Sequence, residues 1–168
     1  MRRLNRFKPR KEKENPLFRV YQTVSFWRTL KNTIVIEFCR YFPWISGKRK
    51  LYRSLLRMEI GENTAVAFKV TFDLFYPEKI KIGRNSIIGF HTTILTHEYL
   101  VEEYRTGEVQ IGDDTMIGAN VTILPGVTIG SRVKVGAGAV VNRDIPDDHL
   151  AFGNPLVVRP LDRENKRD

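Results

Sequence analysis

The sequence has little cysteine and no long hydrophobic run. Its single cysteine, Cys39, excludes an intramolecular disulfide framework and any metal site built on a pair of nearby cysteines. The most apolar N-terminal window, 30–45, is too short to span a bilayer and contains Lys31, Glu37 and Arg40. Because no uninterrupted apolar run follows the basic start, we expect no secretory signal. Together these features predict a cytoplasmic protein.

Acidic residues are outnumbered by basic ones. The 168 residues include 28 Lys and Arg against 19 Asp and Glu, giving a formal net charge of +9 and a pI near 9.8. Such an excess favours an anionic partner, which is a nucleic acid, an acidic membrane or a phosphorylated cofactor. The length and the 42% hydrophobic content suit one domain with an appendage.

The stretch 111–141 repeats with a period of six. A branched aliphatic residue occupies every sixth position, and glycine follows four of these, at 112, 118, 130 and 136; the aliphatic residues are Ile111, Ile117, Ile123, Ile129, Val135 and Val141. This period fits neither the helical 3.6 nor the strand period of two alone. It is typical of the hexapeptide form of parallel β-helix, in which about three hexads complete one coil. The sequence therefore predicts a mainly β protein.

The same phase extends toward the N-terminus with two interruptions. It begins at Ile60, Val66 and Phe72, breaks over 73–80, and resumes at Ile82, Ile88 and Ile94 before a second break. We therefore predict a β-helix over 60–145, an extruded loop over 95–110 and a C-terminal extension over 146–168. A long loop between ordered repeats is a place to look for function.

The N-terminal third differs in composition from the repeats. Residues 1–15 form a basic tail that we expect to be disordered. The apolar spacing over 17–41 predicts a helix, and Ser46 suits the N-cap of a second one, so 16–59 form a helical cap on the prism. Alternatively, this segment attaches to an acidic membrane through its cationic and aromatic residues, which are Arg28, Lys31, Lys48, Arg49, Lys50, Arg53, Arg57, Trp27, Phe42 and Trp44.

Several motifs between residues 89 and 155 carry a family resemblance. His97 follows Thr-Ile-Leu-Thr in the loop, ILPGVTIG occupies 123–130, and Gly153-Asn154-Pro155 closes the block. These residues resemble the hexapeptide-repeat acyltransferases, especially the maltose, galactoside and xenobiotic acetyltransferase branch. The whole chain also looks like uncharacterised acetyltransferases of Gram-positive bacteria. Two positions depart from the family pattern: Met116 replaces a usual Trp, and Leu156-Val157 replace Ala-Arg.

The resemblance implies a left-handed parallel β-helix that transfers an acetyl group from acetyl-CoA directly to a hydroxyl or amine. The acceptor would be a small molecule, a sugar or a glycan, and no metal is expected. It implies a homotrimer, with coenzyme A lying between two subunits. The residues that match the cofactor edge of the family are Ala119, Ala137, Asn142 and Arg143, and Arg159 is a candidate for the missing family arginine.

Acyl transfer needs a base for the attacking acceptor, and histidine suits this role because its pKa lies near neutrality. His97 matches the general base of the family, and Glu98 is adjacent to orient it. Asp73 and Glu78 lie in the earlier phase break and are candidates for binding the acceptor. His91 is a further acceptor-site candidate, although it falls one hexad before His97 and so on another side of the coil.

Two other functions remain open from the sequence. One is a metal hydrase on the same scaffold, resembling the γ-type carbonic anhydrases, but only two histidines lie near the repeats and zinc needs three protein ligands. The other is a non-enzymatic module whose basic tail binds a membrane or a nucleic acid. No nucleic-acid motif is present, so we expect no nucleic-acid partner.

Overall fold

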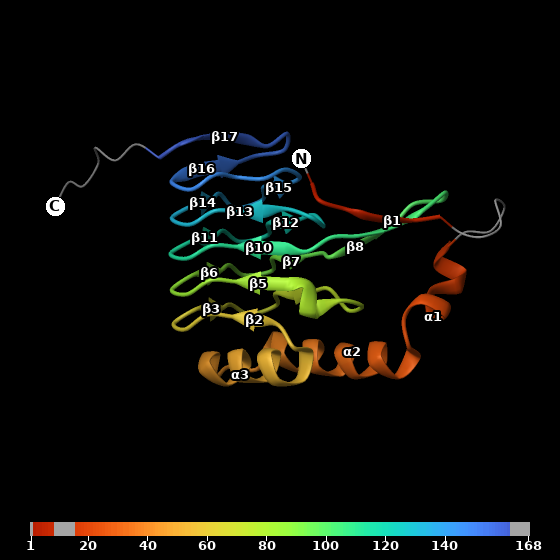
Figure 1. Ribbon diagram of the computed structural model, residues 1–168. Coiled ribbons are helices and arrows are strands. Elements are labelled where there is room, and N and C mark those ends of the chain that lie inside the picture. Colours follow the sequence, from red (N-terminus) through yellow and green to blue (C-terminus); the bar gives the residue numbers. More distant parts are fainter. Residues whose placement is uncertain (1, 9–15, 162–168) are drawn as a thin grey trace.

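The computed structural model describes residues 2–8 and 16–161. Its main body is a three-sided prism of stacked coils, closed at one end by helices and flanked by a protruding hairpin (Figure 1). Neighbouring strands on each side of the prism run parallel, except that the last strand of the chain turns back antiparallel on its neighbour. The predicted left-handed parallel β-helix is confirmed.

Each side of the prism is a sheet built from one strand of every coil. The first face contains β2 (Glu59–Ile60), β5 (Ile80–Ile82), β10 (Val109–Ile111) and β13 (Thr128–Ile129). The second face contains β3 (Ala65–Val66), β6 (Ile87–Ile88), β11 (Met116–Ile117), β14 (Lys134–Val135), β16 (His149–Phe152) and β17 (Val157–Pro160). The third face contains β4 (Thr71–Phe72), β7 (Thr93–Ile94), β12 (Thr122–Ile123) and β15 (Val140–Val141). We number the corners in chain order. The first corner joins the first face to the second, the second corner joins the second face to the third, and the third corner joins the third face to the first face of the next coil.

The hexad residues form the core of the prism. On the first face Ile60, Ile82, Ile111 and Ile129 pair in register through the four coils, and each is at most 4% exposed. The glycine that follows the aliphatic residue is required by close coil packing: a Cβ on Gly118 would lie 2.7 Å from the backbone nitrogen of Ala137 in the next coil. A larger residue there would force the coils apart.

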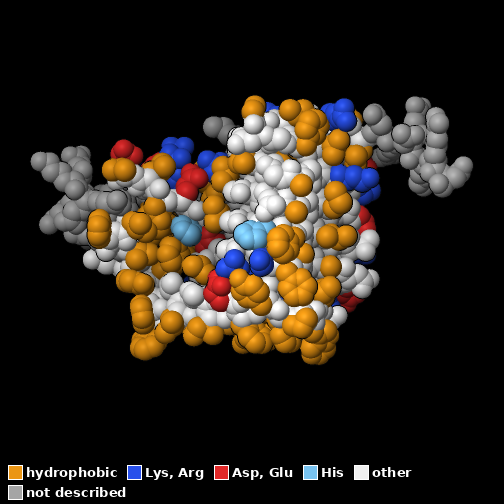
Figure 2. Space-filling model, turned by 180° about the vertical axis from the view of Figure 1, so that it is seen from behind, with side chains coloured by type: hydrophobic (Ala, Val, Ile, Leu, Met, Phe, Trp, Pro, Cys, Tyr) orange, Lys and Arg blue, Asp and Glu red, His pale blue; other side chains and the backbone are white. Residues whose placement is uncertain are grey.

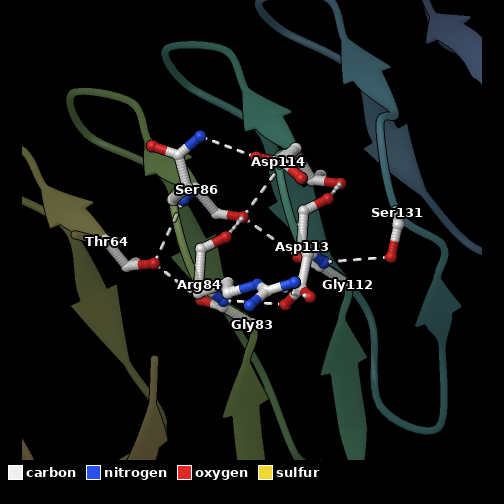
Figure 3. A network of polar contacts seen from close by, with 10 residues as sticks. Thr64, Gly83, Arg84, Ser86, Gly112, Asp113, Asp114 and Ser131 are labelled. Atoms are coloured by element: carbon white, nitrogen blue, oxygen red, sulfur yellow. Dashed lines mark hydrogen bonds and ion pairs between the residues drawn. The ribbon is translucent and has the colours of Figure 1, made fainter. Parts of the chain in front are cut away.

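Hydroxyl side chains line the first corner and bond to the backbone of the next coil (Figure 3). The Thr64 hydroxyl donates to the carbonyl of Gly83 at 2.6 Å. Ser86 donates to the carbonyl of Gly112 at 3.0 Å and accepts the N–H of Thr115. These contacts satisfy buried backbone groups that the corner would otherwise leave unpaired. None of the sequence-predicted site residues lies on this corner.

Two helices close the end of the prism. Helix α2 (Phe26–Tyr41) and helix α3 (Ile45–Leu56) share one buried apolar cluster with the first coils, to which they contribute Ile36, Cys39, Tyr52 and Leu56. The predicted helical cap is thus present, and Cys39 is a core residue. Within the described residues, no helix has the length and apolar character needed to cross a bilayer.

The predicted single helix over 17–41 is interrupted. A 3-10 helix η1 (Pro16–Arg19) and α1 (Val20–Thr23) precede α2, and Ser25 is extended, with φ −61° and ψ 132°. Val24 lies at this break, and its side chain is buried. The apolar spacing in the sequence therefore continues although the helix does not. Trp44, rather than Ser46, is the N-cap residue of α3.

The prediction of a disordered tail is wrong for residues 2–8. Strand β1 (Asn5–Phe7) pairs antiparallel with the hairpin strand β9 (Tyr104–Thr106), and the N–H of Arg3 donates to the carbonyl of Gly126 at 2.9 Å. The pairing satisfies the backbone along an otherwise open edge of the hairpin. The rest of the predicted tail, residues 1 and 9–15, lies outside the described residues.

The extruded loop 95–110 is a β-hairpin. Its strands β8 (His97–Tyr99) and β9 pair antiparallel, and with β1 they form a three-stranded sheet beside the prism. The prism extends beyond the predicted boundary at 145, because β16 continues the second face in register with β14. Strand β17 then turns back against β16, and residues 162–168 of the predicted C-terminal extension lie outside the described residues.

Candidate active site

The third corner brings together two side chains that lie far apart in the sequence. The Nδ1 atom of His97 is 2.5 Å from Oδ2 of Asp73, 24 residues earlier in the chain. The register explains the meeting: Phe72 pairs with Ile94 on adjacent coils, so Asp73 and the start of the hairpin leave the third face side by side. The Asp73 side chain is fully buried, whereas that of His97 is 18% exposed.

The Asp73 carboxylate is held by several backbone groups. Its Oδ1 accepts the N–H groups of Phe75 and Tyr76, at 2.8 and 3.0 Å, and its Oδ2 accepts those of Thr96 and His97, at 2.8 and 3.1 Å. Burial by itself raises the pKa of the Asp73 carboxyl. The hydrogen bond and charge of His97 and the backbone N–H donors outweigh burial, so the pKa lies below its usual value.

An ionised carboxylate fixes the role of each ring nitrogen. Because a carboxylate is only an acceptor, the Nδ1 atom of His97 must carry a proton, and this N–H donates a hydrogen bond to Asp73. The neutral ring then has its lone pair on Nε2, which is the atom that can take a proton from a substrate.

Aromatic side chains surround the His97 ring. The ring centroid of Phe75 is 4.5 Å away, that of Tyr99 is 5.7 Å away and that of Tyr104 is 6.4 Å away. Burial raises the pKa values of the Tyr99 and Tyr104 phenols, so both remain neutral near pH 7. The ring is thus held in a mainly apolar setting with one buried anionic partner.

Glu98, which the sequence suggested as the group that orients His97, faces other partners. Its carboxylate accepts hydrogen bonds from Arg2 at 2.8 Å and from Arg105 at 3.1 Å, and Arg105 also pairs with Glu103. Burial raises the pKa of Glu98, but the two arginines outweigh it and lower the pKa. Glu98 therefore ties the hairpin to the N-terminal segment, and Asp73 takes the position beside His97.

The two other acceptor candidates lie away from this pair. Glu78, in the 3-10 helix η2 (Pro77–Lys79), pairs with Arg28 of α2 at 2.5 Å. His91 is an exposed residue at the second corner, where it has a φ of +61° and its ring centroid lies 5.4 Å from that of the tilted Phe90 ring. The expectation that His91 and His97 occupy different sides of the coil is confirmed.

The candidate cofactor residues gather along the second corner and the last coils. Ala119 and Ala137 follow one another up this corner, where Gly138 donates its N–H to the carbonyl of Ala119 at 2.9 Å. In the two coils nearer the helices the same corner carries exposed Phe68 and Phe90. Small side chains thus leave open space along the half of this corner that lies farther from the helices, which suits a slender group lying against the backbone.

The basic candidates lie near the C-terminal turn. Arg143, next to the exposed Asn142, donates to the carbonyl of Leu156 at 2.8 Å. Arg159 on β17 lies over the ring of Phe152, with its guanidinium carbon 5.6 Å from the ring centroid. Both guanidinium groups have donors beyond these contacts, and such planar donors suit phosphate.

Sequence reasoning missed most of the shell around His97. Asp73 was a candidate for the acceptor site, and Phe75, Thr96, Tyr99 and Tyr104 were not singled out. Counting the hexads could have indicated that Asp73 lies near His97, because the first phase break falls one coil before the histidine loop. Nothing in the sequence around Arg2 or Glu98 indicated that these two residues would contact each other.

Comparison with known proteins places the chain in a family. Residues 108–143 match the model of the bacterial transferase hexapeptide (six repeats). The chain is 54% identical over 144 residues to "Putative acetyltransferase YvoF" of Bacillus subtilis (strain 168), covering 86% of this chain and 84% of that protein.

Two solved structures share the fold. A maltose O-acetyltransferase from Clostridium difficile 630 has a TM-score of 0.65 and 23% identity, covering 82% of this chain and 88% of that one. The hexapeptide-repeat acetyltransferase VCA0836 from Vibrio cholerae O1 biovar eltor, complexed with acetyl-coenzyme A, has a TM-score of 0.61 and 24% identity, covering 81% and 88%.

This chain belongs to the bacterial hexapeptide-repeat transferases, in the group of the acetyltransferases. Across residues 2–8 and 16–161, no three His, Cys, Asp or Glu side chains gather in a way that suits a metal ion. The two alternatives, a metal hydrase and a non-enzymatic binding module, are not favoured beside relatives that are named acetyltransferases.

Proposed function

We propose that the protein transfers the acetyl group of acetyl-CoA directly to a hydroxyl or amine of a small-molecule, sugar or glycan acceptor. The observation that carries this proposal is the pair of His97 and buried Asp73, 2.5 Å apart, on a hexapeptide-repeat prism. In this pair His97 is the general base and Asp73 is the residue that positions it.

The reaction follows from the assigned protons. Nε2 of His97 removes the proton of the acceptor O–H or N–H as the oxygen or nitrogen attacks the thioester carbonyl carbon. The new bond forms, the carbon–sulfur bond breaks, and the thiolate of coenzyme A takes the proton from His97. Asp73 stabilises the positive charge that the ring carries between these two transfers, as a buried carboxylate does for a catalytic histidine.

Coenzyme A, in this proposal, lies along the second corner. Ala119 and Ala137 leave room for the pantetheine arm beside the backbone, while Asn142, Arg143 and Arg159 meet the polar end of the cofactor. The pairing of a guanidinium with phosphate is charge-assisted and directional. Acetyl-CoA is a substrate here, and the proposal includes no metal.

A homotrimer completes the site. His97 lies at the third corner and the two alanines at the second, so in one chain the whole third face separates the base from the cofactor groove. The corner of a neighbouring subunit beside His97 would bring the two halves together. Light scattering at micromolar concentration is expected to give the mass of three chains, and a monomer would contradict this arrangement.

The setting of the enzyme is part of the proposal. A cytoplasmic location suits a protein with one buried free cysteine and a coenzyme A substrate. The exposed side of the helical cap would contact a membrane, and no nucleic-acid partner is proposed.

The direct test is acceptor-dependent release of coenzyme A. The purified protein would be incubated with acetyl-CoA and a panel of sugars, glycans, alcohols and amines while free thiol is measured. We expect at least one acceptor class to raise thiol release well above the rate without acceptor. Thiol release at the acceptor-free rate across all classes, with intact coenzyme A binding, would argue against the proposed transfer.

A further inference from the structure

Helix α2 turns an apolar stripe away from the prism. Apolar residues three and four positions apart form this stripe, and they are 40–74% exposed: Trp27, Leu30, Ile34, Phe38 and Tyr41. We call these residues the outer stripe. The opposite side of the helix carries the buried residues Asn32, Ile36 and Cys39. A surface helix ordinarily turns a polar face to water, so packing within this chain does not account for the stripe.

The outer stripe continues onto the start of α3. Trp44 is 61% exposed and Ile45 is 47% exposed. Ring contacts join Phe38 to Phe42 at 5.0 Å and Phe42 to Trp44 at 6.5 Å. Figure 2 shows hydrophobic side chains gathered along the end of the molecule that the helices close. A contiguous apolar surface of this kind marks an interaction site.

Basic side chains border the apolar surface. On α3 a hollow of about 540 Å³ is lined by Arg49, Lys50, Arg53 and Arg57, together with Ser54 and Met58. A second hollow of about 290 Å³, between α2 and the end of α3, is lined by Arg28, Lys31 and Arg57 among others. Two acids in this region are paired, Glu37 with Arg40 and Glu78 with Arg28, so the net positive charge comes mainly from Lys31 and the basic residues of α3. We call these basic residues the cationic rim.

We propose that the outer stripe and the cationic rim bind the surface of an anionic lipid bilayer. The aromatic and aliphatic side chains would enter the boundary between headgroups and acyl chains, and the lysines and arginines would meet lipid phosphates. A second copy of this chain is a poorer occupant, because face-to-face association would bring two cationic rims together on chains that each carry +9.

The helix that carries the outer stripe also contacts the loop of the candidate active site, through its other side. Asn32 of α2 donates to the carbonyl of Leu74 at 2.8 Å, and the guanidinium carbon of Arg28 lies 5.6 Å from the ring centroid of Tyr76. Leu74 and Tyr76 belong to the loop that begins with Asp73. Docking through α2 would therefore hold the His97 site close to the bilayer, so the acceptor would be a hydroxyl or amine presented at that surface. This last step rests on the proposed function.

The test is sedimentation of the full chain with vesicles. Wild-type protein should bind vesicles containing phosphatidylglycerol and not vesicles of phosphatidylcholine alone, and added salt should weaken the binding. The variants Ile34→Glu/Phe38→Glu and Lys50→Glu/Arg53→Glu should each bind at least about 10-fold more weakly. The matched control is Val157→Glu, an exposed apolar residue on β17 at the other end of the prism, which should bind like the wild type.

Three outcomes would overturn the proposal. They are no binding of the wild type to anionic vesicles, equal binding to both vesicle types, and unchanged binding by the two double variants. If Ile34→Glu/Phe38→Glu altered the oligomeric state while the wild type ignored vesicles, the surface would be a subunit interface. Lys50→Glu/Arg53→Glu, which alters only exposed residues, keeps the test decisive if the first variant folds poorly. Coenzyme A affinity should be equal in the wild type and the two double variants, so a failure here is distinct from a failure of acetyl transfer.

Discussion

Replacing Asp73 by asparagine changes one atom of a group that is bonded on all sides. Its two oxygens together accept the backbone N–H groups of Phe75, Tyr76, Thr96 and His97 and the Nδ1–H of the His97 ring. An asparagine side chain has one oxygen and one NH₂ group. Whichever way it turns, its NH₂ faces at least two buried N–H donors.

The magnitudes follow from these contacts. Each buried donor left without an acceptor costs about 1–3 kcal/mol, so the loss of two acceptors in Asp73→Asn should lower the free energy of unfolding by roughly 2–6 kcal/mol. Loss of a charge-assisted hydrogen bond to His97 removes up to about 3 kcal/mol of stabilisation from the charged ring. At about 1.4 kcal/mol per tenfold, turnover should fall by up to about 100-fold.

The assay is acceptor-dependent thiol release, measured below the melting temperature of the variant. The control is Glu98→Gln, because Glu98 bonds to Arg2 and Arg105 and not to His97. That variant should keep turnover within about fivefold, in line with the small contribution of partly exposed ion pairs. Near-normal turnover in Asp73→Asn together with a large loss in Glu98→Gln would refute the pairing of Asp73 with His97.

Two further predictions concern the cofactor and the acid limit of stability. Arg143→Ala should lose one phosphate contact, worth about 1.5–3 kcal/mol, and weaken coenzyme A binding in calorimetry while leaving the fold intact; unchanged affinity would reject the assignment. The lowered pKa of Asp73 means that the unfolded chain binds more protons, so stability should fall as pH drops below about 4. In acid titrations followed by circular dichroism, Asp73→Asn should lose stability less steeply than the wild type, and equal slopes would contradict the pKa argument.

The fold was predictable because the repeat is local. A hexad places its aliphatic residue inward whatever the rest of the chain does, so Ile60 to Val141 could be assigned from spacing alone. The helical cap followed from the same kind of periodicity. Strand β1 could not be found this way, because Asn5 pairs with Thr106, about a hundred positions away, and nothing in the tail itself signals that partner.

The site was predictable only in part. His97 was identified through its loop and its flanking motif, but adjacency suggested Glu98 as its partner. Neighbouring residues on a strand point to opposite sides, so Glu98 faces Arg105 across the hairpin while His97 faces Asp73. The pairing of Asp73 with His97 required the conformation of the loop after Phe72, because an irregular sequence does not specify where a loop side chain points.

The most direct test of His97 as the general base is the turnover of His97→Ala. Replacing a partly exposed hairpin residue should leave the prism intact, and coenzyme A affinity should change little because the base acts on the acceptor. Turnover on an identified acceptor should fall by about 10²–10⁴-fold, the range for removal of a positioned base, and His91→Ala should be much milder. If His97→Ala kept most of its activity while His91→Ala abolished it, the base would lie at the second corner and the assignment of His97 as the general base would be wrong.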